Sequence, residues 1–314
     1  EKHMLKDYRT RMTGNYEILR ATLQVVNRDA DTLVRLNRAA DEATVAAGRN
    51  PSQSPPVALR LEAVEETVLV PYRSFGYSRG LSVVSGAIWL KYTTTPLEMI
   101  VPKSSGLRIT KSVTPPLAYI VPAQWASVIS VLQAHGVRMR RTSASWRGEV
   151  ETYRCEGVKW QEQSFEGRQV LFVPVEKKSG EASQGACRSV RERLTFPKSS
   201  AVVPLDQRAA RVAIHFLEPE APDSAVAWGF FNAVFEQKEY GEAYVLEKLA
   251  REMMDKDPKL AEEFAQKVAS DNAFASDPSA RLDFFYRRSP WWDSHLGLYP
   301  VGRLSSLEGI PLAP

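Results

Sequence analysis

Apolar residues recur at helical spacing through the first part of the chain. Between residues 7 and 47 they follow one another in steps of three or four, which places them on one face of a helix. Those on the first such face are Met12, Tyr16, Leu19, Leu23 and Val26. A second helical stretch has Asp29 or Asp31 available as its N-cap and Gly48 as its stop. The polar, proline-containing segment RNPSQSPP, residues 49–56, then predicts a linker.

From residue 57 the period of the pattern changes to two. The run VALRLEAVEETVLVPY alternates apolar and polar residues, as a half-buried strand does. Short strand-like runs continue to residue 206 between Gly, Pro and Ser turns: GAIWLKYT, LRITKSV, GEVETYRCEGVKW, RQVLFVPV and ERLTF. This rhythm predicts an antiparallel, sandwich-like β-domain over residues 57–206. One helix near residues 123–135 is expected to interrupt it.

Helix signals dominate residues 207–314. The stretch DSAVAWGFFNAVFEQ offers Asp223 or Ser224 as an N-cap, and DPKLAEEFAQKVASD offers Asp257 followed by Pro258 in the first turn. In the first stretch three aromatic residues recur at steps of three and four, which predicts that they share a buried helix face. They are Trp228, Phe231 and Phe235. The tail RLDFFYRRSPWWDSHLGLYPVGRL suits a segment packed across the surface of its domain.

Composition and charge exclude two classes of partner. The 314 residues are 44% hydrophobic and 25% charged, enough for two globular domains. Apolar runs such as AVAWGFF are far shorter than the about 20 residues of a membrane-spanning helix, so we expect no membrane span. The net charge is only +4, and the basic clusters VRMRRTSASWR and FFYRRSP are short. A nucleic-acid surface gathers its charge on one face, so we expect no nucleic-acid partner.

Two cysteines leave the redox state open. Cys155 and Cys187 are too few for a disulfide scaffold, and they lack the paired spacing of a zinc site. They form either one bridge in an exported protein or two buried thiols. Cys155 is a weak candidate nucleophile, because no histidine lies near it in the sequence.

The histidines offer little for metal chemistry. In HFLE, His215 and Glu218 have the His-x-x-Glu spacing of two metal ligands, but apolar residues flank the histidine on both sides. The only later histidine is His295, in the aromatic tail. Catalytic zinc needs about three protein ligands, so we predict that His215 is a structural histidine beside a strand end. The sequence also lacks a Gly-x-Ser-x-Gly elbow, a phosphate loop and a dinucleotide fingerprint.

Aromatic clusters suggest an alternative. The segments WGFFN, DFFYRR and PWWD belong to a chain with seven tryptophans. Large aromatic residues at helical spacing are mostly core. A surface on which sugars or peptides stack is the alternative.

Several blocks of the sequence resemble a known family. The segment EKHMLKDYRTRMTGNYEIL resembles part of one bacterial branch of the carboxypeptidase A-like zinc metallopeptidases. In that branch a glutamate ends the last core strand and is followed by a histidine, a Leu-Lys pair, a Tyr-x-x-Arg and a helix. The blocks PLAYIVPAQW, LEPEAPDSAVAWGFFN, FEQKEY and ARLDFFYRRSPWWD…LYPV are similar to the C-terminal region of the same proteins. The sequence departs from the family at Met4 and Asp7.

The resemblance implies a catalytic role for Glu1, and it implies that the other active-site residues lie outside this chain. Glu1 falls where the family has its catalytic glutamate, the general base that takes a proton from zinc-bound water. The alternative is that Glu1 is an ordinary surface residue. The zinc ligands and the residue that grips the substrate carboxylate are expected upstream of this chain. The resemblance also implies a peptide substrate and an exported, periplasmic or secreted location, and a homo-oligomer is left open.

The predicted fold class is therefore α+β. Residues 1–48 would be the helical end of a truncated α/β catalytic domain, followed by a linker at 49–56. Residues 57–206 would form the β-rich accessory domain, and residues 207–314 a mostly helical region packed on it. The function expected is that of an accessory, C-terminal part of a zinc metallocarboxypeptidase-like hydrolase, inactive by itself. The alternatives are a stand-alone β-rich module that binds glycan or peptide, and a purely structural domain.

Overall fold

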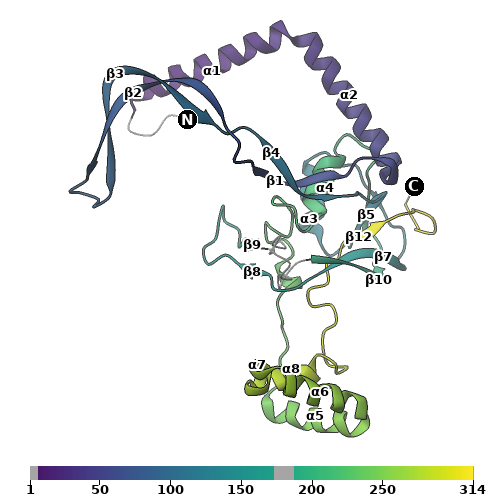
Figure 1. Cartoon of the computed structure of the whole chain (residues 1–314). Helices are drawn as coiled ribbons and strands as arrows, with labels where there is room; N and C mark the ends of the chain where they lie inside the picture. Colours follow the sequence, from purple (N-terminus) through teal and green to yellow (C-terminus); the bar gives the residue numbers. More distant parts are fainter. Residues whose placement is uncertain (1–5, 173–186, 314) are drawn as a thin grey trace. The chain divides into compact units, whose positions relative to one another are not determined.

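The computed structural model describes residues 6–172 and 187–313. Contacts within the chain divide it into two compact units, one made of the residues up to Asn50 together with those from Pro116 onward, the other of Pro51–Pro115. Helices and antiparallel sheets are both present, as the predicted α+β class requires (Figure 1). None of the helices in the described ranges is long and apolar enough to cross a membrane.

A six-stranded antiparallel sheet organises the first unit. Its strand order is β10-β7-β12-β5-β11-β6. The strands are β5 (Ala118–Val121), β6 (Arg140–Arg141), β7 (Trp146–Cys155), β10 (Cys187–Phe196), β11 (Ala201–Pro204) and β12 (Gly302–Leu304). Although β12 comes from the end of the chain, it lies between β5 and β7, with Arg303 opposite Tyr119 on one side and Glu151 on the other. The sheet thus joins segments that are far apart in the sequence.

The core of this sheet lies where apolar residues of several strands meet. Its buried members are Ala118, Ile120, Val150, Phe196, Val202, Leu304 and Ile310. Strand β5 is buried along its whole length, which is why its sequence is a short apolar run without alternation. Gly302 allows β12 to approach β5, because a Cβ atom there would lie 2.8 Å from Cγ2 of Ile120.

The strands predicted for residues 57–206 are antiparallel, but they do not form one sandwich. Those before Pro116 belong to the second unit, whereas β5 and the later strands of the six-stranded sheet pair with β12, which lies beyond residue 206. The short strands β8 (Lys159–Trp160) and β9 (Leu171–Phe172) form a separate pair. Alternation along a strand shows that one of its faces is buried, but it does not show which strand lies beside it. The pattern therefore could not show that these strands belong to separate sheets.

Two helices open the described part of the chain. Helix α1 is Tyr8–Arg28 and begins at Asp7, whose side chain accepts a 2.9 Å hydrogen bond from the backbone of Thr10. Helix α2 is Ala30–Arg49. No residue of α1 is buried, and the predicted apolar face is 45–67% exposed at Met12, Tyr16, Leu19, Leu23 and Val26. Only the end of α2 is packed closely, at Gly48, where a Cβ atom would lie 1.9 Å from the carbonyl oxygen of Leu205.

Two further helices belong to the sheet region. Helix α3 (Ala126–Ala134) lies within the predicted range 123–135, and Gly136, with φ +72°, follows it. Helix α4 is Ala210–Leu217. His215 lies in α4, so the predicted position beside a strand end is wrong. The helix is favoured because its apolar positions repeat at helical spacing and are buried at Ala210, Ala213, Ile214 and Leu217.

The prediction of an α-helix for DSAVAWGFFNAVFEQ is also wrong. The segment forms consecutive turns followed by one short 3₁₀ helix, Asn232–Val234. Gly229 has φ +71°, a left-handed conformation that interrupts an α-helix. Phe231 and Phe235 are nonetheless buried as predicted. Trp228 is half-buried, and its indole nitrogen donates a hydrogen bond to Asp223.

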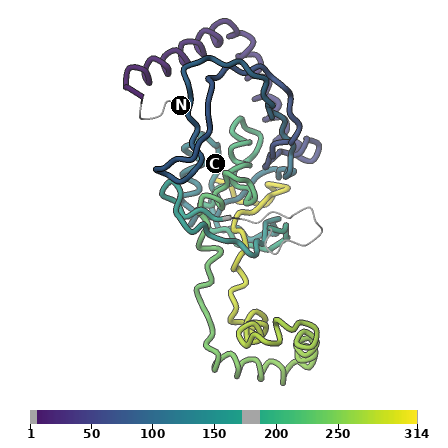
Figure 2. Tube along the Cα trace, turned by 60° about the vertical axis from the view of Figure 1, so that its left-hand side comes forward, coloured from purple at the N-terminus to yellow at the C-terminus, as the bar shows by residue number. Residues whose placement is uncertain are grey.

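Four consecutive helices form a small helical group, drawn in green to yellow in Figure 2. They are α5 (Ala243–Lys256), α6 (Pro258–Ser270), α7 (Asn272–Ser276) and α8 (Pro278–Tyr286). Asp257 caps α6 as predicted, by accepting hydrogen bonds from the backbone of Lys259 and Leu260. The core cluster of this group consists of Ala250, Leu260, Phe274, Phe284 and Phe285. The aromatic segment DFFYRR therefore contributes mainly to a core.

The second unit consists of two antiparallel strand pairs. Strand β1 (Val57–Ala63) pairs with β4 (Leu107–Val113). Strand β2 (Val68–Leu81) pairs with β3 (Ile88–Lys103) to form a long hairpin with one irregularity between Phe75 and Tyr77. The alternating pattern of VALRLEAVEETVLVPY thus corresponds to β1 and the start of β2.

Candidate functional site

A network of buried polar side chains is centred on Glu218, at the end of α4. This carboxylate is 1% exposed. The hydroxyl groups of Tyr119 and Tyr153 donate hydrogen bonds of 2.6 and 2.7 Å to its two oxygens. The guanidinium of Arg303 lies 3.2 Å from Oε1 and also donates to the hydroxyl of Tyr153. Each carboxylate oxygen therefore has a donor.

The sheet brings these partners together. Tyr119 lies on β5, Arg303 directly opposite it on β12, and Tyr153 on β7, two residues along from the partner of Arg303. Because alternate residues of a strand point to the same face, the three side chains share one face of the sheet. The hydroxyl of Tyr299 donates a 2.8 Å hydrogen bond to the carbonyl of Leu217, which fixes the end of α4 against this face.

Burial sets the electrostatics of the network. Burial, and then the charge of Glu218, raise the pKa of Tyr119 and of Tyr153 far above the ordinary value, so both hydroxyls stay protonated and can donate. Burial also raises the pKa of Glu218, against the opposite effect of Arg303 and the two tyrosines. The carboxylate has no contact with the groove described below. We therefore interpret the network as a structural contact that holds the end of α4 against the sheet.

The two residues of the HFLE pair lie in different surroundings. Both oxygens of Glu218 are engaged by the tyrosines. His215 instead faces a separate cavity of about 330 Å³ that also contacts His135 and Asp223. Burial, and then the nearby Arg211, lower the pKa of His215. In residues 6–172 and 187–313, no group of three His, Cys, Asp or Glu side chains is placed to hold a metal ion.

The two cysteines form a disulfide bridge. Cys155 ends β7 and Cys187 begins β10, and the two residues are direct partners in the strand register. A bridged cysteine carries no thiolate, so Cys155 is not a nucleophile here. The sequence left the bridge open because it could not show that these two strands are neighbours.

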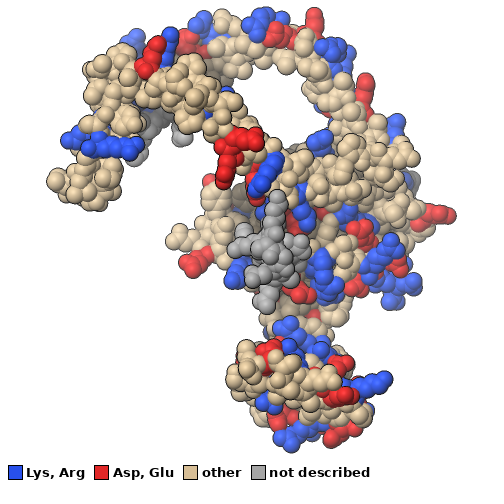
Figure 3. Space-filling view, in the orientation of Figure 1, with Lys and Arg blue, Asp and Glu red and all other residues tan. Residues whose placement is uncertain are grey.

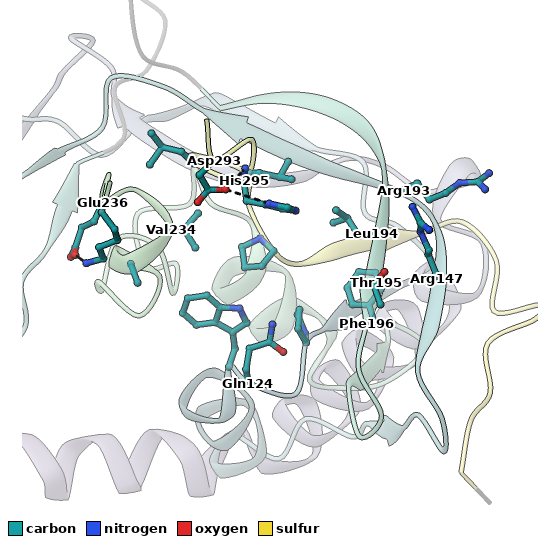
Figure 4. Close-up of a pocket in the computed structure, with 17 residues that line it drawn as sticks. Gln124, Arg147, Arg193, Leu194, Thr195, Phe196, Val234, Glu236, Asp293 and His295 are labelled. Carbon is teal, nitrogen blue, oxygen red and sulfur yellow. Dashed lines mark hydrogen bonds and ion pairs between the residues drawn. The ribbon is translucent and has the colours of Figure 1, made fainter. Parts of the chain in front are cut away.

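A groove of about 540 Å³ lies beside the aromatic tail (Figure 4). One wall carries Asp293 and His295, and Gln124 lies on the opposite wall. The end of β10, Arg193–Phe196, closes the groove at one end, and Glu236 lies at the other. Its volume is in the range of sites for small molecules or short peptide segments.

Asp293 and His295 interact within the groove wall. The Nδ1 atom of His295 lies 3.4 Å from Oδ1 of Asp293, which also accepts a 2.9 Å hydrogen bond from the histidine backbone. Both side chains are about three-quarters exposed, at 75% and 73%. A carboxylate that orients an imidazole is one half of a hydrolytic triad. Thr195 is the one hydroxyl side chain among the described residues that line the groove.

The groove combines a flat apolar surface with charges of both signs. Trp125 lines it and packs on Phe231, with ring centroids 4.6 Å apart. Arg147, Arg193 and Lys238 also line it. Aromatic faces beside cations suit a ligand that has both apolar and anionic parts. Of the aromatic residues proposed for a stacking surface, Trp291 is 74% exposed, whereas Phe231, Phe284 and Phe285 are core.

The one predicted catalytic residue, Glu1, lies outside the described residues. The structure therefore leaves its role a prediction. Sequence reasoning did not find the groove, because its walls come from residues 122–125, from β10 and from the tail, which meet only in the fold. The sequence signal that could have indicated the groove is the pair of blocks PLAYIVPAQW and SPWWD…LYPV, which supply Trp125 and Asp293.

Comparison with known proteins identifies a class of relatives. The chain is 31% identical over 137 residues to carboxypeptidase 2 of Trichophyton rubrum, a match that covers 44% of this chain and 21% of that protein. Carboxypeptidase 2 of Trichophyton tonsurans is 29% identical over 137 residues, and a probable carboxypeptidase 2 of Arthroderma benhamiae is 28% identical over 131 residues. The matched region is about a fifth of the length of each of these relatives.

These matches support a carboxypeptidase-like class. The relatives are fungal and give no support to the bacterial branch. No family model matches the sequence, and no solved structure matches it.

Proposed function

We propose that this chain is the C-terminal portion of a zinc metallocarboxypeptidase-like hydrolase, which cleaves peptide or amide bonds near a free carboxylate. The observation that carries the proposal is the similarity to carboxypeptidase 2 proteins over 137 residues. The blocks that resemble the carboxypeptidase A-like family lead to the same class. The proposal concerns a longer protein, of which this chain supplies the accessory part.

The zinc ligands are assigned to residues outside this chain. In the proposed reaction zinc supplies an activated water for attack on the scissile carbonyl. The HFLE residues are a poor fit to a zinc site, because both oxygens of Glu218 accept hydrogen bonds from tyrosines and His215 faces a separate cavity. The chain's own chemical contribution is Glu1, which we propose as the general base that takes the proton from the attacking water.

The remaining residues are proposed to support the catalytic part. Helix α1 exposes an apolar face at Met12, Tyr16, Leu19 and Leu23, and a helix of this kind gains most of its stability by burying that face. We assign the face to contact with the catalytic domain. The bridge between Cys155 and Cys187 fits an oxidising compartment, which supports export. A homo-oligomer stays a prediction.

The experiment that tests this function compares two proteins. The first is residues 1–314, and the second is the product of the natural gene including any region encoded upstream of Glu1. Zinc content is measured after dialysis, and amino-acid release is measured on one peptide with a free and with an amidated C-terminus. The longer protein should hold zinc and release residues only from the free carboxylate, whereas residues 1–314 should do neither. Zinc bound stoichiometrically by residues 1–314 and lost on His215→Ala would contradict the proposal.

A second function is favoured by the groove. Its aromatic wall and three cations would allow the chain to act as a stand-alone module for a peptide or a glycan. Titration of residues 1–314 with acidic peptides and with oligosaccharides tests this function. Binding that is lost on His295→Ala and kept on His135→Ala would favour the module. Absence of binding in both titrations would remove it.

A further inference from the structure

The far end of the β2–β3 hairpin is apolar and lacks a covering layer within its unit. Val83 and Val84, in the turn, are 102% and 93% exposed. Leu81 and Ile88, the last pair of the ladder, are 73% and 68% exposed. Two strands alone are only marginally stable in water, and exposed apolar groups of this size mark interaction sites. This end, residues 77–92, is called the hairpin end below.

Its charges have one sign. Residues 67–97 contain Arg73, Arg79 and Lys91 and no aspartate or glutamate. Arg73 pairs with Glu98, at 3.0 Å, outside the hairpin end. Lys91 lies 4.6 Å from the ring centre of Trp89, and Arg79 lies 5.8 Å from that of Tyr77. Figure 3 shows the hairpin end as tan surface crossed by a blue band. The end therefore presents two cations stacked on aromatic rings to an anionic partner.

The order of residues along the hairpin matches the layers of a lipid surface. The segment 81–88, with its four large aliphatic side chains, comes first. Trp89 follows, and Arg79, Lys91 and the Tyr77–Tyr92 pair lie further back. At about 3.3 Å per residue, Trp89 lies roughly 10 Å behind the turn. Interfacial segments bury their apolar parts about 5–10 Å deep, with tryptophan, tyrosine and cations at the level of the headgroups.

The turn also satisfies most of its own backbone donors. The amides of Ser82 and Gly86 donate to backbone carbonyls at 2.9 Å. The amides of Val84 and Ser85 donate to the hydroxyl of Ser82, at 3.2 Å in each case, and the amide of Ala87 donates to Ser85. Unpaired amides are costly in hydrocarbon, so a turn whose donors are bonded internally can enter a lipid layer at low cost.

We propose that the hairpin end docks on an anionic lipid surface, with Val83, Val84, Leu81 and Ile88 inserted and Arg79 and Lys91 among the phosphate groups. The proposal goes beyond the proposed hydrolase function and does not depend on it. Docking through exposed residues of the turn requires no rearrangement of β2 or β3.

The test measures co-sedimentation of residues 1–314 with two kinds of vesicle. The protein should sediment with vesicles of phosphatidylcholine and phosphatidylserine, remain in solution with pure phosphatidylcholine, and lose binding as salt is raised. The double variant Val83→Asp/Val84→Asp should lose binding. Leu69→Asp, 72% exposed near the base of the same hairpin, is the matched control and should bind normally.

A charge variant and a spectroscopic measurement complete the test. Arg79→Gln/Lys91→Gln should weaken binding by about thirtyfold, from about 1 kcal/mol for each cation near an anionic surface. Arg108→Gln, on β4, should have no effect. In the unmodified protein, brominated lipids should quench tryptophan emission, and Trp89→Phe should remove that quenching.

Three results would overturn the proposal. The first is absence of binding to anionic vesicles. The second is binding that the turn variant leaves unchanged, which would assign it to another surface such as the exposed face of α1. The third is lipid-independent dimerisation in sedimentation velocity that Val83→Asp/Val84→Asp abolishes, which would make the hairpin end a contact between two copies of the chain.

Discussion

The hydroxyl of Tyr119 donates a 2.6 Å hydrogen bond to Oε1 of Glu218, although 99 positions separate the two residues in the sequence. This contact ties the most buried strand of the sheet to the end of α4. Arg303, from the last strand, completes it at 3.2 Å from the same oxygen. The three segments involved are therefore expected to unfold together.

Loss of the Glu218 carboxylate should be strongly destabilising. Glu218→Leu leaves Arg303 buried without its main counter-charge, which costs about 3–5 kcal/mol in the free energy of unfolding. Urea denaturation measures the change. Glu149→Leu, on the exposed side of β7, is the control and should shift stability by less than about 0.5 kcal/mol. Equal effects of the two substitutions would show that the network does not form.

Phe231 should be a core residue, and Trp228 a weaker contributor. Phe231 is fully buried between Trp125 and Tyr299, at centroid distances of 4.6 and 5.0 Å. Phe231→Ala should cost about 3–5 kcal/mol through the cavity it leaves. Trp228→Ala, at a half-buried position, should cost less. Trp291→Ala is the exposed control, and thermal unfolding ranks the three variants.

His215 should make stability depend on pH. Its pKa is lowered in the folded protein by burial and by Arg211, so the unfolded chain binds the proton more readily. Stability is then present above the unfolded pKa of about 6.5 and falls as the pH drops through the lower, folded value. His215→Gln should flatten the dependence of the unfolding midpoint on pH below about 6.5. An unchanged pH profile would show that His215 does not contribute.

The disulfide bridge should hold β7 and β10 together. Cys155→Ser/Cys187→Ser should lower the free energy of unfolding by about 2–4 kcal/mol, and reductant should have the same effect on the unmodified protein. A thiol titration of the unreduced protein in denaturant checks the premise. Two reactive thiols in the unreduced, unfolded chain would contradict the bridge.

Local signals in the sequence predicted some elements well. Asp257 before Pro258 gave the start of α6, because a cap and the proline after it act within one turn. Helix α1 was also predicted, because its apolar residues have helical spacing. The segment around Gly229 had the same spacing but a left-handed glycine, and Phe231 and Phe235 became core without a helix.

Long-range features could not be predicted. The Glu218 network depends on β12 lying between β5 and β7, and nothing within GRL specifies that neighbour. The groove likewise has walls from segments far apart in the sequence. The Cys155–Cys187 bridge was left open for the same reason, since strand register decides it. Register comes from the tertiary fold, whereas caps and periodicity act over a few residues.

The most direct test of the central claim is made on the natural gene product, with any region encoded upstream of Glu1. It measures the rate of release of C-terminal amino acids after Glu1→Gln. A general base contributes about 10²–10⁴-fold, so the account predicts a loss of this size in kcat with the zinc content unchanged. Glu17→Gln, on exposed α1, is the matched control and should retain full activity. Undiminished turnover by Glu1→Gln, with the zinc still bound, would contradict the account.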